Sequence, residues 1–202
     1  AGCYHQEPMS YSALLTWCKK EAQHFAPYIC DTGSYLEQAL QHGKKVLLEA
    51  QLGAMRDIDY GIFPYTSSSS TISAYGPIGA GIPGAHLDHV VGVLKAYSTC
   101  VGAGPFVAEH ALSETWMESL RKAGGEYGAA TGRPRRVGPF DAVASRYGLK
   151  CQNADQIALT KLDVLSQFDE IPIIVGYKKD GQFVDHFDPM DNLELCEPVL
   201  KY

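Results

Sequence analysis

The stretch Gln156-Ile157-Ala158-Leu159-Thr160-Lys161-Leu162-Asp163 joins a short apolar run to a polar end. Residues 156–160 have the length and apolar content of a β-strand, and the run ends in Thr-Lys-x-Asp. In α/β proteins the carboxyl ends of the strands form the edge at which ligands bind. The stretch therefore predicts a strand that places a lysine and a carboxylate at a ligand-binding edge.

Two further apolar runs predict strands on either side of this one in the sequence. Residues 45–49 hold Val46, Leu47 and Leu48 in a row, which is typical of a strand buried on both faces of a parallel sheet. Residues 171–177 predict another strand, and Asp180-Gly181 predicts a tight hairpin turn into residues 183–187. Residues 64–84, rich in Ser and Gly, predict a loop.

Helical periodicity appears in three segments, residues 9–25, 84–97 and 113–123, the last of which Gly124-Gly125 would end. Ser34 and Glu37 form a capping box, which predicts another helix that Gly43 would close. The order of elements predicts an α/β fold, with a mostly parallel sheet, helices on both of its faces and a β-hairpin near the C-terminus.

The composition is that of a folded chain without a general affinity for polyanions. Of 202 residues 46% are apolar, so we expect residues 1–202 to fold as a single unit. The net charge of -6 argues against nucleic acid or an anionic membrane as a partner. No apolar run approaches the roughly 18 residues that a bilayer span requires.

The cysteines and the first residues bear on the cellular compartment. The six cysteines lie far apart without CxxC pairs, which argues against a zinc site or a compact disulfide framework. No secretory signal opens the sequence. We therefore expect a cytoplasmic protein with reduced thiols.

Residues 128–136, Gly-Ala-Ala-Thr-Gly-Arg-Pro-Arg-Arg, concentrate arginine beside small residues. Guanidinium groups bind carboxylate or phosphate through paired hydrogen bonds, so Arg133, Arg135 and Arg136 predict a local anion site. A solvated basic turn is the alternative. If Arg133 and Arg135 wait for an anion, neither should contribute much to the fold without ligand.

The Thr-Lys-x-Asp end of the predicted strand suits a guanine base. Guanine presents its N1-H and N2 amine side by side, so one ionised Asp163 can accept from both while the stem of Lys161 lies across the ring. An ion pair between these two residues at the strand end is the alternative. The sequence contains no GxxxxGK[ST] phosphate loop, and His86 and His89 have no third metal ligand nearby.

Several blocks, in the same order, resemble the adenylosuccinate synthetase family over nearly the whole span of residues 28–202. They are residues 46–49, 57–64, 94–106, 129–136 and 160–165. The resemblance implies a fold related to the P-loop NTPases. It also implies a homodimeric enzyme that joins L-aspartate to IMP at the expense of GTP, with Mg²⁺, through a 6-phosphoryl-IMP intermediate, in the committed step from IMP toward AMP.

The resemblance carries site residues over position by position. It implies binding of IMP and aspartate by Ser67, Val101, Ala129, Ala130, Thr131, Gly132, Arg133 and Arg135. It implies binding of GTP by Arg135, Lys161, Leu162 and Asp163. The family's catalytic Asp and His, its phosphate loop and its magnesium ligands belong to an amino-terminal stretch without a counterpart here. We therefore expect no catalytic residue and no metal ligand in this chain, which would be an inactive central piece of a longer protein.

The chain also departs from the family pattern at several positions. Leu52 stands where a glutamine amide meets IMP, and Ser67 stands where the family has a phosphate-binding threonine. Cys100 replaces the arginine of the Ser-Thr-Arg-Val block, Tyr60 replaces a histidine, and Pro134 stiffens the arginine loop. These differences leave two alternatives open, which are a divergent paralogue with another purine or amino-acid substrate and a non-catalytic guanine-nucleotide-binding fragment.

Overall fold

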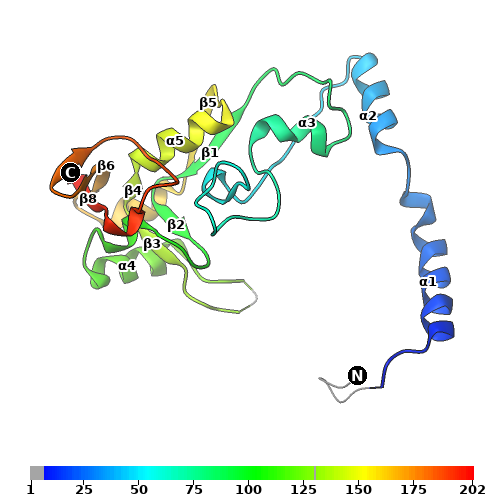
Figure 1. Cartoon of the computed structure of the whole chain (residues 1–202), viewed down its shortest axis with the longest axis horizontal. Helices are drawn as coiled ribbons and strands as arrows, with labels where there is room; N and C mark the ends of the chain where they lie inside the picture. Colours follow the sequence, from blue (N-terminus) through cyan, green and yellow to red (C-terminus); the bar gives the residue numbers. More distant parts are fainter. Residues whose placement is uncertain (1–6, 130) are drawn as a thin grey trace. The chain divides into compact units, whose positions relative to one another are not determined.

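The computed structural model describes residues 7–129 and 131–202. It divides into two compact units, Ala1–Leu47 with Ala80–Ile82, and Leu48–Gly79 with Pro83–Tyr202 (Figure 1). No helix among the described residues is long and apolar enough to cross a membrane. Cys18, Cys30, Cys100, Cys151 and Cys196 are free thiols, whereas Cys3 lies outside the described residues.

The first unit contains two helices, α1 (Tyr11–Phe25) and α2 (Thr32–Gln41), joined by the 3₁₀ turn η1 (Ala26–Tyr28). The prediction of both helices is confirmed, but Ser34 is not the N-cap of α2. Asp31 caps this helix, because its carboxylate accepts the Ser34 amide at 3.1 Å and the Ser34 hydroxyl at 2.7 Å. The Asp31 pKa is lowered by these bonds, the one from the Ser34 amide first. Gly43, at φ +71°, follows the helix as expected.

The strand predicted at residues 45–49 does not form. Leu47 is 95% exposed, and no strand of the described residues pairs with this segment. An apolar run becomes a strand only where a neighbour accepts its backbone hydrogen bonds. The apolar run alone therefore predicted a buried strand, but no partner strand pairs with it and Leu47 is exposed.

In the second unit, β1 (Val91–Lys95) pairs in parallel with β5 (Gln156–Thr160), so that Lys95 lies beside Thr160. The predicted strand at 156–160 is confirmed. The helix predicted at residues 84–97 is wrong, since this segment contains β1 and leads directly into β2 (Ser98–Cys100). Its core, Val90-Val91-Gly92-Val93, combines β-branched residues with a glycine, and a parallel partner strand satisfies its backbone.

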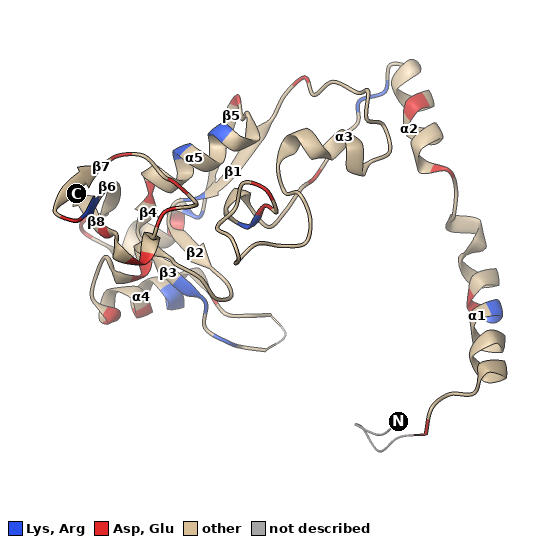
Figure 2. Ribbon diagram, viewed as in Figure 1, with Lys and Arg blue, Asp and Glu red and all other residues tan. Residues whose placement is uncertain are grey.

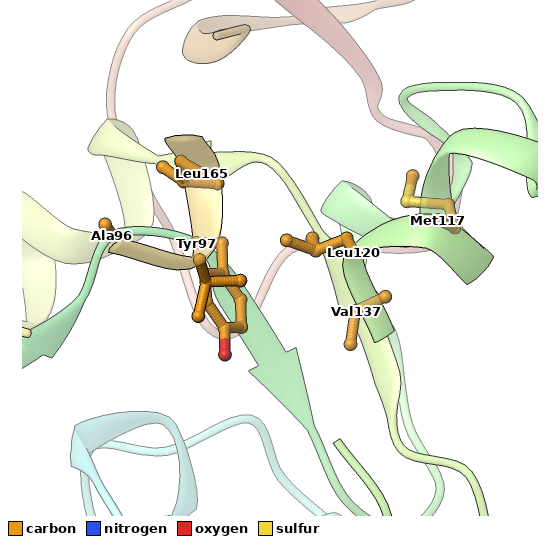
Figure 3. Close-up of a cluster of buried hydrophobic side chains, with 7 residues drawn as sticks. Ala96, Tyr97, Met117, Leu120, Val137 and Leu165 are labelled. Carbon is orange, nitrogen blue, oxygen red and sulfur yellow. The ribbon is translucent and has the colours of Figure 1, made fainter. Parts of the chain in front are cut away.

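Helix α4 (Glu114–Gly124) is the one predicted at 113–123, capped by Ser113 and closed by Gly125 at φ +64°. It lies near β2 and β3 (Arg136–Gly138), which pair antiparallel with Cys100 opposite Arg136 (Figure 1). A buried apolar cluster fills this part of the unit (Figure 3), formed by Ala96, Tyr97, Met117, Leu120, Val137, Val164 and Leu165.

The remaining sheet is centred on β6 (Ile173–Lys179). It pairs in parallel with β4 (Phe140–Asp141) and antiparallel with β7 (Gln182–Val184) and β8 (Glu197–Lys201). The predicted hairpin is confirmed, with Asp180 and Gly181 both at positive φ in the turn. Helix α5 (Ala142–Gln152) precedes β5. The α/β class is confirmed, with parallel and antiparallel pairing combined.

Short turns complete the second unit. The predicted loop at 64–84 is confirmed apart from η3 (Ser73–Tyr75) and the single turn α3 (Gly76–Gly79). The other 3₁₀ turns are η2 (Ala54–Arg56), η4 (Val107–His110), η5 (Leu162–Gln167) and η6 (Leu193–Leu195). A second buried cluster supports the β6 sheet, formed by Val107, Ala108, Val143, Ile174, Tyr177 and Leu193.

Candidate functional site

The arginine-rich segment forms a closed loop ahead of β3. Tyr127 and Pro134 form an antiparallel bridge, and the Gly128 amide donates to the Arg133 carbonyl at 2.8 Å. Gly132 adopts φ +63° and donates to the Gly128 carbonyl at 2.8 Å. The Thr131 hydroxyl oxygen accepts the Arg133 amide at 3.3 Å. The backbone thus fixes the shape of the loop, whose Arg133 side chain is exposed.

The candidates Ala129, Thr131 and Gly132 lie at the tip of this loop, whereas the candidate Ala130 lies outside the described residues. Figure 2 shows basic residues gathered where the loop enters β3. The tip therefore presents small and polar groups beside a guanidinium, which is a suitable composition for an anion.

Glu126 is the centre of the charged cluster. Its side chain is 2% exposed and accepts from Lys95 Nζ at 2.8 Å, Arg135 Nη1 at 2.9 Å and the Tyr97 hydroxyl at 2.6 Å. Burial alone would raise the Glu126 pKa, but the hydrogen bonds from Lys95 and Tyr97, with the positive charges of the cluster, hold it below its ordinary value. One buried carboxylate therefore holds two cations.

Tyr97 links this cluster to the apolar core. Its ring lies among the buried side chains while its hydroxyl points away from them (Figure 3). That hydroxyl donates to Glu126. Burial raises the Tyr97 pKa, and the negative charges of Glu126 and Asp163 raise it further. The end of β5 lies close to this cluster, because Thr160 pairs with Lys95 and its carbonyl accepts the Ala96 amide at 2.9 Å.

Lys161 and Asp163 follow β5 directly. Both lie within the described residues, and they do not form an ion pair with each other. Lys161 adopts φ +63°, which directs the chain from β5 into η5, and its Nζ donates to the Gly124 carbonyl at 3.3 Å. Asp163 and Leu162 are exposed. The strand-end ion pair is therefore not observed, and Lys161 and Arg135 both reach the short segment that runs from Gly124 to Glu126.

The three arginines of the loop have different partners. Arg136 donates to Glu109 Oε2 through Nε and Nη2, at 2.8 and 2.5 Å, and to the carbonyls of Gly104 and Gly102 at 2.8 and 3.2 Å. The Glu109 pKa is lowered mainly by this bonding. Arg136 is thus a structural residue, and a solvated basic turn does not describe Arg135 or Arg136. The ion pair of Arg135 with a buried acid argues against the expectation that this residue contributes little to the unliganded fold.

Arg56 joins two other candidates, Ser67 and Val101. Its carbonyl accepts the Ser67 amide at 2.7 Å, and its Nη2 donates to the Val101 carbonyl at 3.0 Å. Val101 is 70% exposed and directly follows Cys100, which lies opposite Arg136. The Ser67, Val101 and Arg135 segments therefore meet through Arg56 and the β2–β3 pair.

A buried carboxylate supports the loop that carries Ser67. Asp57 accepts the amides of Thr71 at 2.6 Å, Asp59 at 2.9 Å and Tyr60 at 3.0 Å. Burial alone would raise its pKa, but these amide bonds, that of Thr71 first, lower it. Beside Ser67, a hollow of about 430 Å³ is lined by Ile58, Asp59, Ser68, Ser69, Ser70, Ile72, Ala74, Tyr75 and Ile78.

Sequence reasoning missed Glu126, Arg56 and Glu109. Arg56 could have been singled out, because it is the only Lys or Arg between Lys45 and Lys95. No local pattern marks Glu126, since its partner Lys95 lies 31 residues away. His86 and His89 are not on a helix, and His89 instead lies 3.2 Å from Asp155.

The fold and the site define an α/β protein with cationic and carboxylate groups gathered at strand ends. The model of the family described as adenylosuccinate synthetase matches residues 2–202, and the chain belongs to this family.

Related proteins match nearly all of this chain but only part of their own length. The chain is 43% identical over 198 residues to the adenylosuccinate synthetase of Caldicellulosiruptor saccharolyticus, covering 97% of this chain and 46% of that protein. It is 47% identical over 195 residues to that of Frankia alni, covering 96% and 45%. The chain thus spans about half the length of the curated relatives it matches.

A solved structure agrees with this relationship. The fully ligated adenylosuccinate synthetase of Plasmodium falciparum matches with a TM-score of 0.85 and 35% sequence identity, covering 99% of this chain and 48% of that chain.

Proposed function

We propose that this chain is part of a cytoplasmic, homodimeric GTP-dependent ligase that joins L-aspartate to IMP in purine nucleotide biosynthesis. The convergence on residues 124–126 carries the proposal: Arg135 and Lys95 bind Glu126, and Lys161, two residues before Asp163, reaches Gly124. Family membership supports the reaction class. Under this proposal residues 1–202 form one piece of a longer domain.

In this function the arginine loop holds the anionic groups. Arg133, Thr131 and Gly132, with Ala129 and Ala130, bind aspartate and IMP. Arg133 also meets IMP, and Arg135, which belongs to the same aspartate-binding loop, also meets GTP. Its Nε and Nη2 have no partner among the described residues, so its free edge can donate two parallel hydrogen bonds while Nη1 stays on Glu126.

The end of β5 recognises the base. Asp163 is exposed and accepts the N1-H and the N2 amine of guanine, and Lys161 and Leu162 line the same edge. Ser67 and the Val101 backbone contact IMP on the other side of the site. Such a reaction depends on positioning and charge stabilisation rather than on an activated nucleophile.

The family generally uses Mg²⁺, but the described residues do not fit it. No three His, Cys, Asp or Glu side chains gather within residues 7–129 and 131–202 in a way that would hold a metal ion. None of the described residues is therefore assigned to the metal.

Nucleotide selectivity tests the proposal. Calorimetry with GTP, XTP and ATP should show a preference for GTP in the wild-type chain. Asp163→Asn offers one acceptor and one donor, which suits xanthine, so the variant should lose GTP and gain XTP. An unpaired buried donor or acceptor costs about 1 to 3 kcal/mol, enough to reverse the preference.

Asp169→Asn is the matched control, because Asp169 is an exposed acid a few residues further along and should not affect selectivity. If Asp163→Asn keeps the GTP preference of the wild type, the guanine site lies elsewhere.

Leu52 favours one alternative, a paralogue with another purine substrate. It is 57% exposed and adopts φ +77°, a conformation that L-residues other than Asn and Asp seldom adopt. Its side chain cannot donate a hydrogen bond to a nucleotide. In the IMP reading, Leu52→Gln should tighten IMP binding by up to about tenfold, one net hydrogen bond. Unchanged affinity in calorimetry would show either that Gln51 already fills this role or that IMP is not the ligand, as in the paralogue.

A further inference from the structure

Arg56 holds together the loop that follows β2. Its Nη2 lies 2.9 Å from Cys100 Sγ and 3.0 Å from the Val101 carbonyl. Its Nη1 donates to the carbonyls of Ala103, at 3.2 Å, and Tyr65. One half-buried guanidinium therefore joins residues 100–103 to the loop that contains Tyr65 and Ser67.

The charge of Arg56 is not neutralised by any acid among the described residues. The neighbouring Arg136 also approaches Cys100, at 3.9 Å, but it is paired with Glu109. A net positive charge therefore remains beside the Cys100 thiol and the Val101 carbonyl. The family resembled by the sequence carries that charge on an arginine at position 100 itself.

We propose that Arg56 supplies from a neighbouring segment the guanidinium that Cys100 lacks, and thereby positions the Val101 backbone for the nucleotide. The positioning role rests on the proposed function, whereas the relocation of the charge does not. The small thiol leaves room for the Arg56 head group and accepts one of its N–H groups. An arginine at position 100 would place a third guanidinium against Arg56 and Arg136, and among the described residues only Glu109 pairs with either of them.

A double-mutant cycle tests the relocation. Arg56→Met keeps the alkyl stem of the side chain and removes its guanidinium. Cys100→Arg adds a guanidinium at position 100. We expect each single variant to lower the melting temperature of the chain and the combined variant to recover most of the loss. A combined variant whose loss equals the sum of the two single losses would overturn the proposal.

IMP binding by calorimetry tests the positioning role. Arg56→Met should weaken IMP binding by about tenfold, the equivalent of about 1.4 kcal/mol, and Cys100→Arg in the Arg56→Met chain should restore it. Arg56→Lys keeps the charge but not the planar fork that reaches four acceptors, so it should recover binding only in part. Arg146→Leu, at an exposed arginine of α5, is the matched control and should change neither the melting temperature nor the affinity for IMP.

The two proposals fail in different ways. If the wild-type chain does not bind IMP, both the proposed function and the positioning role of Arg56 are contradicted. The double-mutant cycle of melting temperatures still tests whether Arg56 supplies the guanidinium that Cys100 lacks. A chain that binds IMP but shows additive losses keeps the proposed function and removes the role of Arg56.

Discussion

At Glu126 a buried carboxylate meets two cations and a phenol that come from two other segments of the chain, residues 95–97 and Arg135. Glu126→Gln would leave Lys95 and Arg135 facing an amide, whose NH₂ group repels them. Breaking a buried ion pair by removing one partner costs about 3 to 5 kcal/mol. We expect Glu126→Gln to lower the free energy of unfolding by an amount near the lower end of this range, because both cations keep partial access to water. Urea denaturation measures this loss.

Glu170→Gln provides the comparison for that experiment. Glu170 is exposed and should change stability by no more than about 0.5 kcal/mol. Equal effects of the two variants would show that Glu126 is not the electrostatic centre of the site.

Without ligand, alanine variants of the loop arginines Arg133 and Arg135 should differ in their effect on the free energy of unfolding. Arg133 is exposed and has no ion-pair partner among the described residues, so Arg133→Ala should lie within about 0.5 kcal/mol of wild type. Arg135→Ala removes a charged hydrogen bond to a buried acid and should cost about 1.5 to 3 kcal/mol. Unfolding curves of both variants measure the two losses. A larger loss for Arg133→Ala than for Arg135→Ala would contradict the prediction.

The same carboxylates give stability a defined dependence on pH. The pKa values of Glu126 and Glu109 are lowered in the folded chain. Their contribution is therefore fully present above the unfolded pKa of about 4.3 and is lost as the pH falls through the folded values. Unfolding free energies measured from about pH 6 downward should fall more steeply for the wild type than for Glu126→Gln.

At the scale of elements, local chemistry decided what could be predicted. Helix α4 carries an N-cap, Ser113, and a C-terminal glycine, Gly125, and was predicted almost to the residue. Residues 84–97 carry apolar side chains at helical spacing, yet pairing with β5 gives a strand instead. Because β5 lies 60 or more residues further on, the sequence around β1 does not contain the deciding contact.

The candidate site divides in the same way. The arginine loop and the end of β5 were predicted, because each is a compact motif with recognisable chemistry. Their connection through Glu126 and the role of Arg56 depend on contacts between distant segments, which no short pattern encodes.

A glycine fixes the contact between β3 and η4. A Cβ added at Gly138 would lie 2.3 Å from the Ala108 carbonyl oxygen, which belongs to the backbone and cannot rotate away. Gly138→Ala should therefore destabilise the chain by about 1 to 3 kcal/mol. Gly84→Ala, with nothing within 4 Å, should show no such loss in the same thermal melts.

At the scale of the whole molecule, the chain exposes apolar surface on its parallel strands. Val91 and Val93 of β1 are 50% and 70% exposed, and Ile157 and Leu159 of β5 are 57% and 45% exposed. Strands of this composition are normally covered. We expect the isolated chain to bind a hydrophobic dye and to self-associate.

Replacing Val91 and Val93 by Thr keeps β-branched residues in β1 while adding hydroxyls, so dye binding and association should decrease with little loss of fold. Light scattering and circular dichroism measure the two effects. A double variant that associates as strongly as the wild type would show that another surface is responsible.

The charged centre also makes the protein sensitive to its buffer. Lys95 and Arg135 outnumber Glu126 by one charge, and adding Lys161 and Asp163 leaves the sum unchanged. That surplus attracts small counterions, so chloride, sulfate or inorganic phosphate will compete with any anionic molecule at this place. The Debye length shrinks from about 30 Å at 0.01 M salt to about 8 Å at 0.15 M. Affinities measured in dilute and in physiological salt will therefore differ, and phosphate buffers will hide weak binding.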